Sequence, residues 1–168
     1  LEFQSDADAR EMLDRLEVST FEESKQVNTC QAYELFLMRF PDGKYSKEAQ
    51  SKLFMIAAEN GDNEKIQSLI KGGVNLDTKD EKEETALVVA SFNGHIAVVK
   101  TLVLNGSSVD LNNKYGQSPL MLASYKGHKD IVKFLVNSGA NVNLADKGGH
   151  TPLIAASQEG HKDIVKFL

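Results

Sequence analysis

The sequence predicts an all-α solenoid of four repeated helix pairs, the last one incomplete, preceded by an N-terminal helical cap. The first observation is a glycine that recurs every 33 residues, at Gly61, Gly94, Gly127 and Gly160. The second is that residues 118–135 align without a gap onto residues 151–168, with 13 of the 18 positions identical. A fixed period of this length indicates a stack of equivalent units, because each unit buries its apolar face only against its neighbours.

Each unit begins with residues that favour a helix N-terminus. Thr85, Ser118 and Thr151 have hydroxyl groups that accept hydrogen bonds from first-turn amides, so we expect them to be N-caps. Pro119 and Pro152 follow at the first helical position, where no amide hydrogen is needed. The sequence therefore predicts inner helices that start after these caps and end at the periodic glycines, which tolerate the positive φ of a C-terminal cap.

Apolar residues at helical spacing predict which helix faces are buried. An outer helix is expected to follow each periodic glycine, and a loop, called a finger below, to connect it to the next inner helix. The residues expected in the core are Leu87, Ala90, Leu120, Ala123, Leu153 and Ala156 on the inner helices, and Ile66, Leu69, Ile70, Val98, Val99, Leu102, Ile131, Val132, Leu135, Ile164, Val165 and Leu168 on the outer helices.

The 33-residue period, the Thr-Pro-Leu start at 151–153 and the three Gly-His pairs resemble the ankyrin repeat family. The resemblance implies an ankyrin-repeat solenoid that binds a protein partner. It also implies the repeat boundaries, which are expected at about 46–79, 80–112, 113–145 and 146–168.

Some positions depart from the family pattern. Val88, Met121 and Ile154 stand where the family usually has histidine, which predicts apolar contacts between repeats in place of a polar network. Ala86 replaces the usual proline of the second repeat, and Glu83 replaces a finger glycine. The first repeat has neither the Thr nor the Pro and is expected to act as a terminal, capping repeat.

Residues 1–45 do not fit the period and are expected to form a helical segment distinct from the repeat domain at 46–168. Ser5 and Ser19 are expected to open two helices, Ser19 with Glu22 as a capping box. A further apolar stripe, expected to end at Pro41, consists of Val27, Cys30, Tyr33, Phe36, Leu37 and Phe40. Residues 32–53 resemble a tetratricopeptide-like helical pair found in many bacterial proteins, which implies a bacterial source.

Composition excludes several classes of function. The net charge of −5 argues against general affinity for nucleic acid or anionic membrane and slightly favours a basic or neutral partner. The single cysteine, Cys30, excludes an internal disulfide or a cysteine-based zinc site. No apolar run approaches the roughly 20 residues that span a bilayer, so we expect a soluble chain. Its compartment is left open between cytoplasmic and, if a signal peptide was removed, periplasmic or secreted.

Three periodic histidines, His95, His128 and His161, are the strongest candidates for a catalytic or metal site. Residues 33 apart lie on successive repeats, separated by roughly 10 Å of helix packing, whereas zinc needs donors at about 2 Å. A structural role is therefore favoured. The sequence contains no nucleophile with a base partner, no phosphate-binding loop, and no EF-hand spacing around Asp146, which is read as a turn residue. We expect no catalytic, cofactor or metal site.

The ankyrin resemblance implies that binding residues lie in the fingers and just before the inter-helix glycines. Phe92 and Tyr125 occupy equivalent positions and, with Tyr115, would supply the aromatic side chains that interfaces favour. The alternative is that Phe92 only packs against the next repeat. The full set of expected partner-binding residues is Glu81, Lys82, Glu84, Phe92, Asn93, Lys114, Tyr115, Gln117, Tyr125, Lys126, Lys147, His150, Gln158 and Glu159, with Glu59 and Asn60 at the matching position of the first repeat.

The sequence thus predicts a non-catalytic module that binds a protein partner across a concave groove. An alternative is a regulatory or targeting segment of a larger enzyme or secreted effector, truncated after residue 168. Leu168 aligns with Leu135, after which the third repeat continues. We therefore expect the native chain to continue, and the unfinished end of the fourth repeat to fray or to support self-association.

Overall fold

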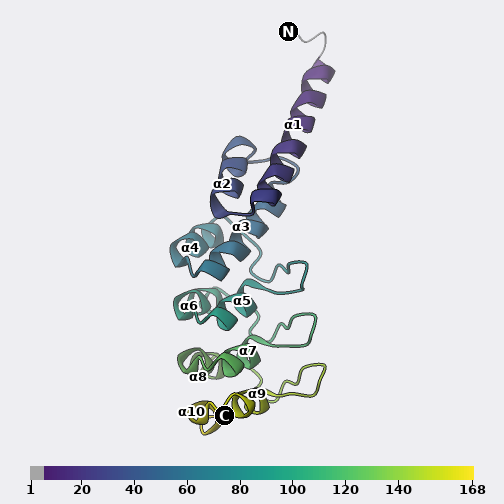
Figure 1. Cartoon of the computed structure of the whole chain (residues 1–168). Coiled ribbons are helices and arrows are strands. Elements are labelled where there is room, and N and C mark those ends of the chain that lie inside the picture. Colours follow the sequence, from purple (N-terminus) through teal and green to yellow (C-terminus); the bar gives the residue numbers. More distant parts are fainter. Residues whose placement is uncertain (1–5) are drawn as a thin grey trace. The chain divides into compact units, whose positions relative to one another are not determined.

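The computed structural model describes residues 6–168, which contain ten α-helices and no β-strand (Figure 1). The all-α class is therefore confirmed for these residues. Contacts divide the chain into two units, residues 1–56 and 57–168, and the division falls inside helix α3 (Ser46–Asn60). The boundary expected at residue 45 stays a prediction. Within residues 6–168, no helix has both the length and the apolar character needed to cross a membrane.

The first unit begins with α1 (Asp6–Val27), a single helix of 22 residues. The prediction that Ser19 opens a second helix is therefore wrong. Ser19 Oγ donates to the Leu16 carbonyl oxygen at 3.1 Å, which satisfies the hydroxyl inside the helix. Glu22 forms an ion pair with Lys25 at 2.8 Å. The helix start expected at Ser5 lies outside the described residues.

Helix α1 ends at Val27, so this residue does not share a helix with the rest of the predicted apolar stripe. Asn28 has a positive φ of 48°, and Thr29 caps α2 (Cys30–Arg39) by accepting from the Ala32 amide at 3.3 Å. Val27 therefore ends α1 and is 62% exposed, so it does not belong to the apolar stripe of α2. The predicted stop at Pro41 is confirmed, because α2 ends two residues earlier.

Aromatic side chains form the core of the first unit. The Phe21 ring stacks on Tyr45 with centroids 4.8 Å apart and packs against Phe36 at 5.2 Å. Ser46, at the start of α3, donates its hydroxyl to the Phe40 carbonyl oxygen at 2.6 Å. The tetratricopeptide-like interpretation and the bacterial source stay predictions.

In the second unit, inner helices pack on inner helices and outer helices on outer helices (Figure 1). The inner helices are α5 (Ala86–Asn93), α7 (Pro119–Lys126) and α9 (Pro152–Gln158), and the outer helices are α4 (Asn63–Lys71), α6 (Ile96–Leu104), α8 (Lys129–Asn137) and α10 (Lys162–Val165). Three fingers project from the same side of this stack (Figure 1).

The predicted helix N-caps are confirmed. Thr85 accepts from the Val88 amide at 3.3 Å, and Ser118 and Thr151 make the equivalent bonds. Pro119 and Pro152 occupy the first helical positions. Gly94 and Gly127 are the C-caps of α5 and α7, with φ of 83° and 79°. The predicted end of α9 at Gly160 is one residue late, because Glu159 is its C-cap and Gly160 follows with φ of 75°. These features depend on local backbone chemistry, so the sequence pattern identifies them directly.

Most of the predicted core is buried, with five exceptions. Leu153 is 42% exposed, although Leu120 at the equivalent position is fully buried. The reason is that α7 lies between α5 and α9, whereas α9 has an inner helix, α7, on only one side within residues 6–168. The other exceptions are half-buried side chains on the first and last outer helices, Leu69, Ile70, Val165 and Leu168.

Candidate functional site

One side chain closes the turn of each finger. In the second finger, Asn113 Oδ1 accepts from the amides of Tyr115 at 3.0 Å and Gln117 at 3.1 Å. Asp80 and Asp146, 33 residues away on either side, make the same pair of bonds in the first and third fingers. Such side-chain hydrogen bonds stabilise the turn of each finger. The turn role predicted for Asp146 is confirmed.

Backbone hydrogen bonds also join neighbouring fingers. The Lys114 amide donates to the Lys82 carbonyl oxygen at 3.3 Å, and the Lys147 amide donates to the Tyr115 carbonyl oxygen at 3.0 Å. Glu83 adopts a positive φ of 59°, close to the 82° of Gly116 at the matching position. The first finger therefore keeps the same turn as the second without the glycine, but holds a side chain in a conformation that favours glycine.

A hollow of about 310 Å³, called the finger groove below, lies between the first two fingers and the inner helices. Buried Val88 and Leu122 contribute apolar surface, and carboxylate, amide and aromatic groups surround them. The lining residues are Glu59, Lys82, Glu84, Val88, Val89, Phe92, Asn93, Asn113, Tyr115, Gln117 and Leu122.

The finger groove brings together part of the predicted partner-binding set. Six residues of the predicted set line the groove, together with Glu59 of the first repeat: Lys82, Glu84, Phe92, Asn93, Tyr115 and Gln117. The remaining members lie outside its lining: Glu81, Lys114, Tyr125, Lys126, Lys147, His150, Gln158 and Glu159. Sequence reasoning missed Asn113, although an Asp or Asn that recurs at the start of every finger is a signal that could have found it.

The three predicted aromatic residues have large exposed surfaces. Phe92 is 38% exposed, Tyr125 42% and Tyr115 55%. Lys126 Nζ lies 4.4 Å from the centre of the Phe92 ring and 5.8 Å from that of Tyr125. Lys114 Nζ lies 5.1 Å from the Tyr115 ring. Cation–π attraction holds these two lysines against the aromatic surface.

The periodic histidines connect successive repeats. The Nε2 atoms of His95, His128 and His161 lie 2.8, 3.0 and 2.9 Å from the carbonyl oxygens of Glu59, Phe92 and Tyr125 respectively. A carbonyl oxygen only accepts, so each Nε2 carries the proton and donates it. That nitrogen therefore has no lone pair for a metal ion. Within residues 6–168, no group of three His, Cys, Asp or Glu side chains is arranged to hold one.

In the third finger a histidine side chain lies against an aspartate. His150 Nδ1 lies 3.3 Å from Asp146 Oδ1, which also accepts from two finger amides. Burial acts to raise the pKa of Asp146, but the hydrogen bonds from the His150 and Gly148 amides and the nearby imidazole outweigh it. The pKa of Asp146 therefore lies below its ordinary value, and the carboxylate is ionised at neutral pH.

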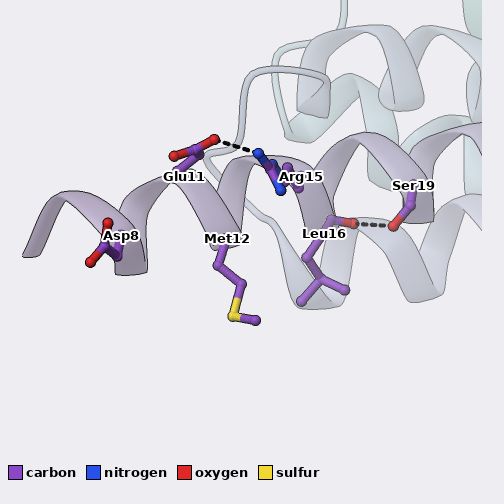
Figure 2. A pocket seen from close by; sticks show the side chains of 6 residues that line it. All are labelled: Asp8, Glu11, Met12, Arg15, Leu16 and Ser19. Carbon is purple, nitrogen blue, oxygen red and sulfur yellow. Dashed lines mark hydrogen bonds and ion pairs between the residues drawn. The ribbon is translucent and has the colours of Figure 1, made fainter. Parts of the chain in front are cut away.

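A second hollow lies on the surface of α1 (Figure 2). It is lined by Asp8, Glu11, Met12, Arg15, Leu16 and Ser19. Arg15 pairs with Glu11 at 2.6 Å, and Ser19 bonds back to its own helix. All the lining residues among 6–168 come from a single helix, so within the described part of the chain no second element faces them. The finger groove is the better candidate site.

Comparison with known proteins supports the repeat interpretation. A protein-family model described as ankyrin repeats, in three copies, matches residues 54–146 and 90–168. Together the two matches span residues 54–168, which is more than half of the chain. A comparison with curated proteins finds no match.

Proposed function

Because the chain belongs to the ankyrin repeat family, we propose that residues 57–168 bind a protein partner across the finger groove. Repeats of this family generally act as protein–protein interaction modules and are typically non-catalytic. The observation that carries the proposal is the groove itself. It combines an apolar floor, two exposed aromatic side chains and a polar rim, which is the composition of a protein-binding surface.

Hydrogen bonds within and between the fingers support the proposed binding role. Asn113 closes the second finger, and backbone bonds join that finger to both neighbours. A partner would therefore meet loops that are already ordered, which lowers the entropic cost of association. The same bonds occupy Asn113 Oδ1 with two amides, which favours a binding role over a catalytic one.

Aromatic residues would contribute most of the affinity. Phe92 and Tyr125 occupy equivalent positions on α5 and α7, and both keep about two fifths of their surface exposed. Their backbones are held by His128 and His161 of the following repeat. Such anchored aromatic side chains are the residue type that most often dominates interface energies.

Affinity capture from a lysate of the source organism would identify the partner. The double change Phe92→Ala plus Tyr125→Ala is expected to weaken its binding by about 30-fold or more, because truncated interface aromatics often cost about 2 kcal/mol. Leu104→Ala is the matched control, since Leu104 is 77% exposed on the outer helix α6. Unchanged affinity in the double variant, with an unchanged thermal melt, would contradict the proposal.

A further inference from the structure

We propose that the partner segment carries charges of both signs: basic residues against the first finger, and acidic residues against the lysines of the next two repeats. This inference rests on the proposed function. It adds the chemistry of the segment that lies in the finger groove.

The first finger is strongly acidic. Residues 80–84 read Asp-Glu-Lys-Glu-Glu, so four carboxylates accompany one lysine. Asp80 is engaged with the finger amides, while Glu83 is exposed and Glu84 lines the finger groove. Glu59 adds a further exposed carboxylate to the same lining. This end of the groove therefore attracts cations and repels phosphate or carboxylate groups.

The groove also has the right groups to hold one cationic side chain. Glu59 and Glu84 line the same hollow as the rings of Phe92 and Tyr115, and Lys82 is the single basic residue among its lining residues. A guanidinium group forms ion pairs with carboxylates and stacks on aromatic faces. An ammonium group also forms ion pairs with carboxylates and makes cation–π contacts with aromatic rings. An arginine or lysine of the partner is thus the side chain that this hollow accommodates best.

The sign of the charge changes one repeat further along. The second finger carries Lys114 and no carboxylate, α7 carries Lys126, and the third finger carries Lys147. Asp146 is the acidic residue of the third finger, and its Oδ1 is turned to the finger amides and His150. Glu159, at the end of α9, marks the far limit of this basic region.

The spacing of the two regions sets the spacing in the partner. Successive repeats are separated by roughly 8–10 Å, the distance between packed helices. An extended peptide advances about 3.3–3.6 Å per residue. The basic and acidic residues of the partner should therefore lie about three residues apart in an extended segment.

A random library of displayed 12-residue peptides tests this pairing directly, with the full 168-residue chain as the target. We expect the selected peptides to contain Arg or Lys about three residues from Asp or Glu. A synthetic selected peptide should bind at least about tenfold more tightly than a counterpart in which its charged residues are replaced by Gln.

Charge-reversed variants of the protein give the matching control. Glu59→Lys plus Glu84→Lys changes the charge in the finger groove, and Glu64→Lys plus Asp130→Lys makes the same net change on the outer helices α4 and α8. The groove variant should lose affinity for the selected peptide by about tenfold, and the outer-helix variant should keep it.

The outcomes separate the inference from the proposed function. Peptides that need Phe92 and Tyr125 but carry no paired basic and acidic residues, or that bind the groove-reversed variant equally well, would overturn the inference alone. Selected peptides that bind the Phe92→Ala plus Tyr125→Ala variant unchanged, or a selection that yields no binding peptide, would contradict the proposed function instead.

Discussion

His128 Nε2 lies 3.0 Å from the carbonyl oxygen of Phe92, a residue 36 positions earlier in the chain. Phe92 therefore has its backbone tied to the following repeat while its side chain is exposed toward the finger groove. The imidazole of His128 lies directly over Gly94, where an added Cβ would come within 2.7 Å of the ring. The glycine that ends α5 thus also makes room for the bond that anchors the groove.

Replacing Gly94 with alanine should lower the free energy of unfolding by more than the strain of its positive φ alone would. Gly94 and Gly73 both have φ of 83°, but a Cβ at Gly73 would meet no atom within 4 Å. Gly73→Ala should lower the free energy of unfolding by roughly 1–2 kcal/mol through backbone strain, and Gly94→Ala should lower it further by displacing His128. Urea denaturation of both variants measures the difference. Equal losses would show that the His128 contact contributes nothing.

Glu83→Gly should stabilise the protein. Glu83 holds a left-handed φ of 59°, which is unfavourable for a residue with a Cβ. Relief of this strain should raise the free energy of unfolding by up to about 1 kcal/mol, after the greater freedom of glycine in the unfolded chain is subtracted. Glu81→Gly, in the same finger and without a positive φ, should be neutral or destabilising. A lower melting temperature for Glu83→Gly would refute the strain argument.

Two buried serines of the inner helices should tolerate removal of their hydroxyl groups. Ser91 Oγ and Ser124 Oγ are fully buried and have no hydrogen-bond partner among residues 6–168. Ser91→Ala should raise the free energy of unfolding by about 1 kcal/mol, because an unpaired buried polar group is costly. Ser157 is the equivalent, exposed serine of α9, and its hydroxyl donates to the Leu153 carbonyl oxygen. Thermal melts should show a smaller gain for Ser157→Ala, and the opposite ranking would count against this explanation.

The third finger should lose stability in acid. The pKa of Asp146 lies below its ordinary value, so its contribution is complete above about pH 4, the unfolded-state value, and is lost as the pH falls through the folded-state pKa. Asp146→Asn keeps an oxygen that accepts from the finger amides, as Asn113 does in the second finger. Denaturation at several pH values should therefore show a weaker dependence below pH 4 for the variant. Parallel curves would exclude Asp146 as a source of acid sensitivity.

The sequence by itself determined the features whose chemistry is local and repeated. Thr85 and Ser118 cap helices because a hydroxyl at that position reaches the first-turn amides in any context. The glycine at 94 takes a positive φ because no other residue does so without strain. A 33-residue repeat of such signals was enough to predict the inner helices, the outer helices and the family.

Only the tertiary structure decided features that depend on distant partners. Ser19 matches a capping box, but nothing breaks α1 there, and the serine bonds inside the helix instead. Leu153 matches the buried Leu120 in sequence, and its exposure follows from which helices flank α9. Leu120 is therefore buried and Leu153 exposed despite the same local sequence pattern, because the burial of a side chain depends on which helices pack beside it.

The finger groove, too, could be predicted from the sequence only in part. Its residue types could be located from the repeat, including the aromatic position of Phe92 before the inter-helix glycine. The hollow shared by Glu59, Phe92 and Tyr115 required the tertiary structure, because these residues come from three different segments of the chain. A periodic sequence determines what each repeat contributes, whereas the distances between repeats are set by how their side chains pack.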